Sequence, residues 1–262
     1  MVKYFVPTSR WEEPLHLEVV KFSYISTPGL LNTQFVMVLQ EGGVRTETFR
    51  ELREQAEVKI VDIYLPEAPG KVLPAIEALS RETKRFTSQG AVPTPDPSDP
   101  DAPKPSNFEL HEALLAGFDR TEPYIGEKLR ACAELKLRRV RETAPIPVPE
   151  SVSLAIVPDP TEELPEGYVF FQIDGIDNAL KGKEVLVLRN PAYRLSDCQK
   201  LRVADADRFP KLRPYTDVLI MSVQGTMREA ERLGNGDYDG DRVVIIYDQT
   251  IVAEFSKGHL DI

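Results

Sequence analysis

Three carboxylates occupy alternate positions near the carboxyl end of the sequence. Asp237, Asp239 and Asp241 lie in the run Gly-Asp-Tyr-Asp-Gly-Asp. In an extended strand they would share one face, and a bend at Gly240 would let them converge on one point. Converging carboxylates repel one another unless a cation compensates them, and Mg²⁺ prefers such hard oxygen ligands. We therefore expect all three to be metal ligands and catalytic residues of a Mg²⁺ site, with Mn²⁺ as the alternative ion.

A site of this kind suits nucleotidyl transfer. One or two ions, about 3.5–4 Å apart, can activate a ribose 3′-hydroxyl and stabilise a leaving pyrophosphate. The run Gly234-Asn235-Gly236 would let a nucleotide approach the backbone closely, because glycine has no side chain to obstruct it. The apolar run that begins at Arg242 would hold the loop rigidly.

Two other interpretations of the same run compete with the Mg²⁺ site. A segment rich in Asp and Gly can be a polar turn between two strands. An EF-hand calcium loop has the pattern Asp-x-Asp-x-Asp-Gly, but here glycine precedes the third aspartate and Arg242 follows it. The flanks also look like strands, whereas an EF-hand has helices. The residues alone thus leave the polar turn as the serious alternative to a metal site.

The half of the chain that carries the aspartates predicts a small β domain. Short apolar runs alternate with turn residues, which indicates six short strands in a closed barrel or a sandwich. The expected strands are Ser153–Val157, Tyr168–Ile173, Glu184–Leu188, Lys200–Ala204, Asp217–Val223 and Arg242–Tyr247.

The first half predicts mainly helices. Its expected elements are a strand over 15–27, a helix that Asn32 or Thr33 caps and Gly42–Gly43 ends, a helix from Thr46, an amphipathic helix over 71–87 and a long helix over 107–141 that Pro123 interrupts. The segment near 91–107 is rich in proline and polar residues, so we expect a disordered insert. The sequence therefore predicts an α+β chain, with a mixed, helical region over 1–144 and a β domain over 145–262.

Composition narrows the classes of protein. The net charge of −10 argues against binding nucleic acid through overall basicity, so RNA binding would need local basic patches. No apolar run reaches the roughly eighteen residues of a membrane span, and no signal peptide is evident. Cys132 and Cys198 lack metal-ligand spacing and are expected to be reduced thiols. We expect an intracellular protein, cytoplasmic or nuclear, without a membrane partner.

The acidic run also carries a family resemblance. Asn235-Gly-Asp-Tyr-Asp-Gly-Asp-Arg-Val resembles the catalytic signature of the cellular, RNA-silencing type of RNA-dependent RNA polymerase, typically Gly-Gly-Asp-Leu-Asp-Gly-Asp before an apolar strand. A related Asp-Phe-Asp-Gly-Asp run occurs in multisubunit DNA-dependent RNA polymerases. Further segments resemble the silencing family in its own order: Leu30-Leu-Asn-Thr-Gln with the following apolar run, Pro158-Asp-Pro-Thr with the following Glu-Gly-Tyr-Val, and Val185-Leu-Val-Leu-Arg-Asn-Pro.

This resemblance implies a fold, an activity and partners. The fold would be a double-psi β-barrel behind a helical segment, and the activity would be Mg²⁺-dependent, RNA-directed RNA synthesis that makes double-stranded RNA for silencing. The partners would be an RNA template and ribonucleoside triphosphates. Family members are much larger and contain two barrels, so the chain resembles a fragment or truncated relative that a first barrel or another polymerase chain would complete.

The resemblance and the local charge together nominate nucleotide- or RNA-binding residues. Arg189 and Asn190 lie in a matched segment, Arg228 is a basic residue of the barrel half, and Lys3 resembles a lysine of the first barrel's motif. Two alternatives stay open: a catalytically inactive polymerase-like module that binds RNA or acts as a scaffold, and a relative of the large subunit of DNA-dependent RNA polymerase.

Overall fold

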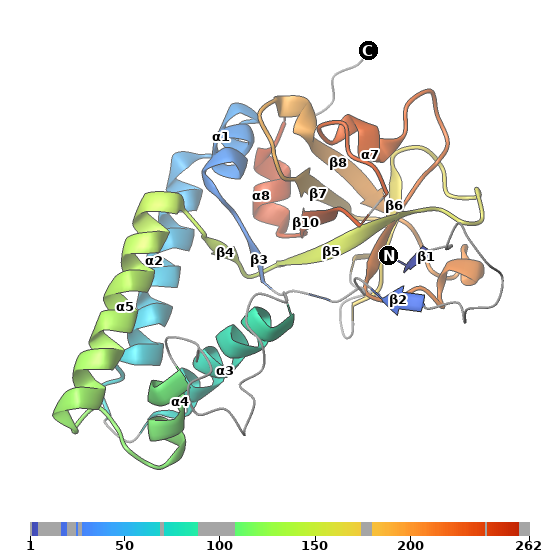
Figure 1. Ribbon diagram of the computed structural model, residues 1–262. Coiled ribbons are helices and arrows are strands. Elements are labelled where there is room, and N and C mark those ends of the chain that lie inside the picture. Colours follow the sequence, from blue (N-terminus) through green and yellow to red (C-terminus); the bar gives the residue numbers. More distant parts are fainter. Residues whose placement is uncertain are drawn as a thin grey trace. The chain divides into compact units, whose positions relative to one another are not determined.

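The structure is a computed structural model that describes residues 2–4, 17–19, 25, 28–68, 71–88, 108–173, 180–238 and 240–256 (Figure 1). The chain divides into two compact units. We call residues 1–52 and 145–262 the barrel unit, and residues 53–144 the helical unit. No helix within the described ranges is both long and apolar enough to cross a membrane.

The barrel unit is built on a closed barrel of six strands. Their order around the barrel is β10-β5-β9-β6-β8-β7. The strands are β5 (Ser151–Pro158), β6 (Tyr168–Phe170), β7 (Glu184–Arg189), β8 (Cys198–Val203), β9 (Val218–Met221) and β10 (Arg242–Ile246). The pairs β5–β9 and β6–β8 are parallel, and the others are antiparallel. All six expected strands are present, and the α+β class with a barrel is confirmed.

Alternating side chains fill the barrel. Val152, Leu154 and Ile156 of β5 are buried in its core, while the residues between them are partly exposed. Strands β7 and β10 are buried along almost their whole length, and helix α8 (Gln249–Glu254) lies against β7. A strand covered on both faces must be apolar throughout, which explains the continuous run Val243–Ile246.

Residues 28–52 belong with the barrel, and for this reason the two units do not coincide with the expected division after residue 144. Strand β3 (Gly29–Leu30) pairs with β4 (Pro147–Val148), and the Leu31 amide donates to the Ile146 carbonyl at 2.8 Å. The hydroxyl of Ser151 accepts from the Gly29 amide at 2.8 Å. Two segments that are far apart in sequence are thus joined before β5 begins.

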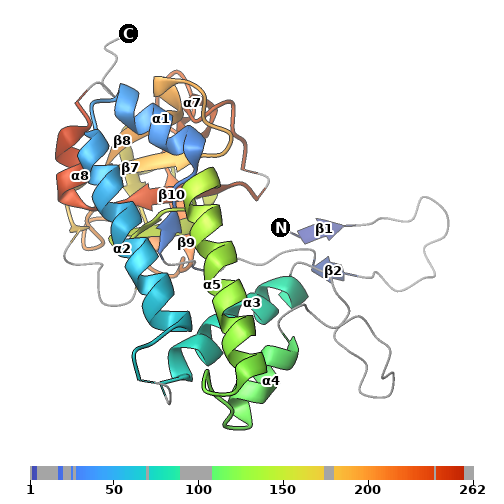
Figure 2. The ribbon, with the colours of Figure 1, turned by 90° about the vertical axis from the view of Figure 1, so that its left-hand side faces the viewer.

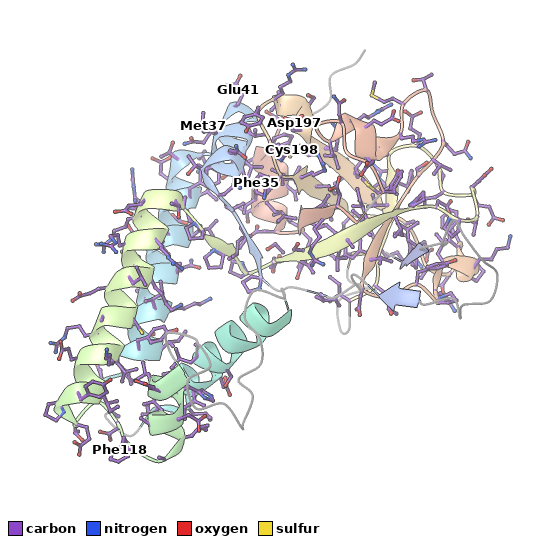
Figure 3. All side chains as sticks on the ribbon, in the orientation of Figure 1. Phe35, Met37, Glu41, Phe118, Asp197 and Cys198 are labelled. Carbon is purple, nitrogen blue, oxygen red and sulfur yellow. The ribbon has the colours of Figure 1, made fainter. Side chains whose placement is uncertain are left out.

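Helix α1 (Thr33–Glu41) begins and ends where its sequence predicts. The Asn32 side chain caps it by accepting from the Phe35 amide at 2.8 Å. Phe35 is buried, whereas Met37 is 64% exposed on the outer side (Figure 3). Gly42 ends the helix, and a Cβ there would lie only 2.0 Å from the ring of Phe255. Glycine is therefore required for the chain after α8 to pack against α1.

The helical unit contains most of α2 (Thr46–Tyr64) together with α3 (Leu73–Ser88), α4 (Phe108–Leu115) and α5 (Pro123–Thr143). Helices α2 and α5 run side by side (Figures 1 and 2), and Arg141 Nε donates to Glu57 Oε1 at 3.1 Å between them. The buried core of the unit consists of Tyr64, Ala75, Leu79, Leu110, Leu114, Ile125, Leu129 and Ala133.

The expected helix over 107–141 is two helices. Helix α4 ends at Leu115, and Pro123 is the first residue of α5, where a missing amide proton has no effect on helix hydrogen bonding. The expected insert near 91–107 lies outside the described residues. Of the strand expected over 15–27, the structure describes β2 (Leu17–Val19), which pairs antiparallel with β1 (Val2–Tyr4).

Candidate active site

Residues 234–241 form a loop between α7 (Glu229–Arg232) and β10, and we call it the acidic loop. Its first part folds back onto α7, because the amides of Asn235 and Gly236 donate to the carbonyls of Glu231 and Ala230, each at 3.0 Å. Asn235 has a φ of 56°, in the left-handed region. A Cβ on Gly236 would lie 2.7 Å from the Ala230 carbonyl, so this close return requires glycine.

The two described aspartates of the loop lie beside each other. Asp241 immediately precedes β10, and its carbonyl accepts from the Ile156 amide of β5 at 3.0 Å. Its Oδ2 atom lies 3.4 Å from the amide of Asp237, whose side chain is exposed. Asp239 lies outside the described residues. The described ranges contain no group of three His, Cys, Asp or Glu side chains fit to hold a metal, so the triad stays a prediction.

Arg189 joins the end of β7 to the acidic loop. Its Nε donates to Oδ2 of Asp241 at 2.6 Å, and its Nη1 donates to the carbonyl of Gly234 at 3.2 Å. Its side chain is 15% exposed and that of Asp241 is 24% exposed. A charge-assisted contact at this depth fixes the carboxylate more firmly than a surface ion pair would. The predicted RNA-binding residue thus holds a predicted metal ligand in place.

Asn190 connects two of the segments that suggested the family. The Asn190 side-chain carbonyl accepts from the Asn32 side-chain amide at 2.7 Å. Asp197, which is buried and follows the same turn (Figure 3), accepts from the amides of Tyr193 and Arg194 at 2.7 and 2.8 Å. These contacts organise the loop after β7, and they make Asp197 a structural carboxylate of that loop.

The segment around Asp159 is held in a similar way. The Asp159 carboxylate is buried and accepts from the amides of Leu164 and Thr161 at 2.8 Å each, and from the Thr161 hydroxyl at 2.7 Å. Burial acts to raise the pKa of Asp159, but these hydrogen bonds outweigh it and hold the pKa below its ordinary value. The turn between β5 and β6 is therefore stabilised by an ionised carboxylate.

The described part of the molecule gives no contacts that support the two other residues predicted to bind nucleotide or RNA, Arg228 and Lys3. Arg228 precedes α7, is exposed and makes no ion pair with any residue that the structure describes. Lys3 lies in β1 opposite Glu18 in the strand register, and its side chain is outside the described part of the molecule. Both assignments to nucleotide or RNA stay predictions.

Two buried polar groups, on Glu229 of α7 and on Tyr238 of the acidic loop, were not identified from the sequence. Glu229 is 1% exposed, and its Oε1 accepts from the Gly167 amide at 3.1 Å. Its Oε2 and the Tyr238 hydroxyl are both buried, and neither has a hydrogen-bond partner among the described residues. Burial raises the pKa of both groups. No periodicity marks Glu229, because a Glu in an Arg-Glu-Ala-Glu-Arg run resembles a solvated helix face.

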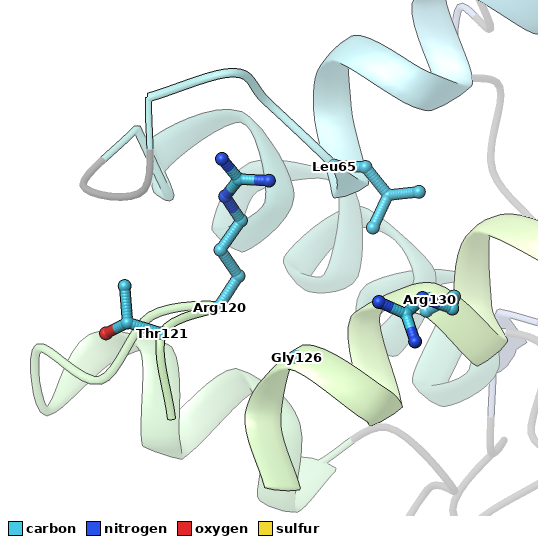
Figure 4. Close-up of a pocket in the computed structure, with 5 residues that line it drawn as sticks. All are labelled: Leu65, Arg120, Thr121, Gly126 and Arg130. Atoms are coloured by element: carbon cyan, nitrogen blue, oxygen red, sulfur yellow. The ribbon is translucent and has the colours of Figure 1, made fainter. Parts of the chain in front are cut away.

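A pocket of about 210 Å³ lies within the helical unit (Figure 4). Leu65, Arg120, Thr121, Gly126 and Arg130 line it, and the Arg120 guanidinium also donates to the Glu67 carbonyl at 2.5 Å. None of the predicted site residues lines this pocket. The candidate active site therefore rests on the acidic loop and not on the pocket.

The closed mixed barrel thus carries the Asp-x-Asp-Gly-Asp run of the sequence just before β10, with Arg189 bonded to its last aspartate. The family model described as RNA dependent RNA polymerase matches residues 1–260. The chain therefore belongs to the RNA-dependent RNA polymerase family, and the resemblance seen in the sequence is confirmed.

Individual relatives agree with this assignment. The chain is 23% identical over 263 residues to "Probable RNA-dependent RNA polymerase 1" of Oryza sativa subsp. japonica, covering 94% of this chain and 32% of the relative. It is 24% identical to "RNA-dependent RNA polymerase 1" of Schizosaccharomyces pombe, covering 90% of this chain and 19% of the relative.

A solved structure shares the fold. It is the RNA dependent RNA polymerase QDE-1 from Thielavia terrestris, which matches with a TM-score of 0.71 and 25% identity over 94% of this chain and 27% of that chain. The chain thus spans about a third or less of the length of the proteins it matches.

Proposed function

We propose that this chain carries the metal-binding, nucleotidyl-transfer site of an RNA-directed RNA polymerase. The observation that supports this most directly is the pairing of Asp241 with Arg189 and Asp237 at one end of the barrel, in a chain of this family. Asp237, Asp239 and Asp241 would hold the ion. Hard carboxylate oxygens beside an open loop suit Mg²⁺, or Mn²⁺ in its place.

The chain's own residues would prepare the site for the reaction. Arg189 fixes one oxygen of Asp241 and compensates its charge, and the carbonyl of Asp241 is bonded to β5, so the carboxylate has little freedom to move. When bound, Mg²⁺ would supply the charge that activates a 3′-hydroxyl and stabilises the leaving pyrophosphate. Rate enhancement in such reactions comes mainly from positioning and electrostatics, which a rigid carboxylate set provides.

The substrates would be an RNA template and ribonucleoside triphosphates, and the product would be double-stranded RNA for silencing. The net charge of −10 means that phosphate contacts must come from local cations such as Arg228, from Asn190 and Lys3, or from another polymerase barrel as partner. Neither Cys132 nor Cys198 forms a disulfide, which fits a reducing compartment, the cytoplasm or the nucleus.

Binding of Mn²⁺ to the full chain, followed by electron paramagnetic resonance, tests the site independently of activity. Asp237→Asn, Asp239→Asn and Asp241→Asn should each weaken binding by at least about tenfold, since even residues that only support metal ligands are worth 10–100-fold. Asp207→Asn removes an exposed carboxylate of the same unit and should change nothing. Equal Mn²⁺ affinity in all four variants would refute the proposed site.

Primer extension with Mg²⁺ then separates an active enzyme from the inactive alternative. An active chain extends an RNA primer on an RNA template, and the three triad variants abolish extension while Asp207→Asn retains it. RNA binding without extension, and without dependence on the triad, would instead identify the RNA-binding or scaffold module. Extension on DNA templates alone would favour the DNA-dependent relative.

A further inference from the structure

The pocket of the helical unit lies at the start of helix α5 and is cationic (Figure 4). We call it the α5 pocket. Its volume of about 210 Å³ is several times the roughly 30 Å³ that one water takes up in the liquid, so it has room for a small anionic group. Two of the residues that line it are arginines, Arg120 and Arg130, and none of the described residues that line it is acidic.

Arg120 brings an unpaired donor to the wall of the pocket. Its Nη2 atom donates to the Glu67 carbonyl at 2.5 Å, which fixes the direction of the guanidinium. Its Nε atom is buried and has no hydrogen-bond partner among the described residues. Buried polar groups in folded proteins are almost always bonded, because an unpaired group costs its full desolvation. A ligand with acceptor oxygens in the pocket would supply the missing partner.

Arg130 adds a second positive charge. It lies one turn after Gly126 on α5, it is exposed, and no ion pair joins it to any residue that the structure describes. In Figure 4 its guanidinium points toward the side of the pocket where Arg120 lies. Arginine stays protonated at any physiological pH, so both charges are always present. The pocket therefore favours an anion.

The start of α5 favours the same kind of ligand. The helix has 21 residues and begins at Pro123, and no side chain of the described residues caps its first turn. Such a helix end carries a partial positive charge and free amides that suit phosphate groups. The Asp119 carboxylate is engaged within the turn, where it accepts from the Thr121 amide and hydroxyl at 2.8 and 2.5 Å. Glu122 and Glu127 are exposed and do not line the pocket.

We propose that the α5 pocket binds a phosphate group and that Arg120 and Arg130 contact it. The planar guanidinium fork matches the oxygens of a phosphate, and hydrogen bonds between two charged groups are the strong ones. In a chain of this family the phosphate has two natural sources, the RNA backbone and a ribonucleoside triphosphate. The inference goes beyond the proposed function, because the pocket lies in the helical unit and none of the proposed metal ligands lines it.

Binding of three probes to the full chain tests the pocket. The probes are inorganic phosphate and ATP, followed by calorimetry, and a labelled single-stranded RNA oligonucleotide, followed by fluorescence anisotropy. All are measured with EDTA, so that no metal-bound nucleotide contributes. Arg130→Met should weaken binding about tenfold, the effect of one charge-assisted contact. Arg120→Lys keeps the charge and a donor for the Glu67 carbonyl but lacks the fork, so it should weaken binding as well.

A matched control and the salt dependence make the result specific. Arg138→Met removes an exposed arginine of the same helix that does not line the pocket, and it should leave the affinity for each probe unchanged. If RNA supplies the phosphate, the slope of log affinity against log salt should become shallower by about 0.7 in Arg130→Met, the value for one lost contact with a single strand. A residue that only supports the fold would not change this slope.

The three probes distinguish the sources of the phosphate. A loss for RNA alone identifies a backbone site, and a loss for ATP identifies a nucleotide site. The proposal is refuted if Arg130→Met and Arg120→Lys bind all three probes as tightly as the parent protein. It is also refuted if Arg138→Met loses as much as Arg130→Met, because the effect would then belong to the charge of the whole helix.

The test is independent of the metal site. If Asp241→Asn leaves Mn²⁺ binding unchanged while Arg130→Met weakens phosphate binding, the proposed function fails and the α5 pocket stands. If Asp241→Asn weakens Mn²⁺ binding while Arg130→Met changes nothing, the metal site stands and the α5 pocket is refuted.

Discussion

Replacing Arg189 tests the contact on which the candidate site depends most. In Arg189→Met the carboxylate of Asp241 loses its charged partner, and the Gly234 carbonyl loses a donor. A hydrogen bond to a charged group contributes about 1.5–3 kcal/mol, and breaking a fully buried pair costs about 3–5 kcal/mol. Because the two side chains are 15% and 24% exposed, we expect a loss of about 2–3 kcal/mol in the free energy of unfolding.

That loss corresponds to a fall of about 4–12 °C in the melting temperature of the barrel unit, at about 2–4 °C per kcal/mol. Urea and thermal unfolding, followed by circular dichroism, measure it. Arg202→Met is the matched control. Arg202 lies in the same barrel, but its side chain is 52% exposed and its ion pair with Glu184 is long, at 3.9 Å. It should cost less than about 1 kcal/mol.

A double-mutant cycle with Asp241→Asn isolates the pair itself. We expect a coupling free energy of about 1–2 kcal/mol between positions 189 and 241, within the range for residues in direct contact. Arg189→Lys keeps the charge but lacks the fork that reaches the carboxylate and a carbonyl together, so it should recover only part of the loss. The reasoning is refuted if Arg189→Met costs no more than Arg202→Met, or if the coupling is absent.

Three further predictions concern the frame around the site. The pKa of Asp159 is lower in the folded protein than its unfolded value of about 3.9, so its ionised carboxylate stabilises the fold fully above that value and less as the pH falls through the folded pKa. Asp159→Asn should remove this contribution. The free energy of urea unfolding should therefore vary less with pH below about 5 in the variant than in the parent protein. Gly236→Ala should cost about 1–3 kcal/mol and weaken Mn²⁺ binding, because the new Cβ meets the Ala230 carbonyl. Gly42→Ala should lower the free energy of unfolding by about 1–3 kcal/mol, measured by thermal unfolding, because the new Cβ meets the ring of Phe255. Phe255→Leu, which removes that ring, should restore part of the loss in the double variant.

Local patterns in the sequence predict the elements well. Alternating apolar residues predict β5, and turn residues at each end delimit the other five barrel strands. The start of α1 follows from Asn32, since a side chain that caps the first turn acts within three residues. Such features depend on neighbours in the chain, so a single sequence contains the information needed to find them.

Contacts between distant residues are a different case. Arg189 and Asp241 are 52 positions apart, and no spacing rule predicts that the arginine predicted to bind RNA contacts a predicted metal ligand. The burial of Glu229 was equally hidden, because it depends on a turn at Gly167 that approaches from 62 positions away. Sequence patterns therefore indicated which residues form the candidate site, but the closed barrel determines which of them touch.

The pairing of β3 with β4 has a consequence for how proteins of this kind can vary. It joins Gly29 to Val148 and Leu30 to Pro147, so two parts of the barrel unit that flank residues 53–144 in the sequence are bonded to each other. Residues 53–144 are thus inserted in the sequence between two segments that pair within the barrel unit. Closing a longer or shorter module across such a junction adds little entropy cost. We expect length variation among relatives to concentrate in this module, while the barrel that bears the aspartates keeps its register.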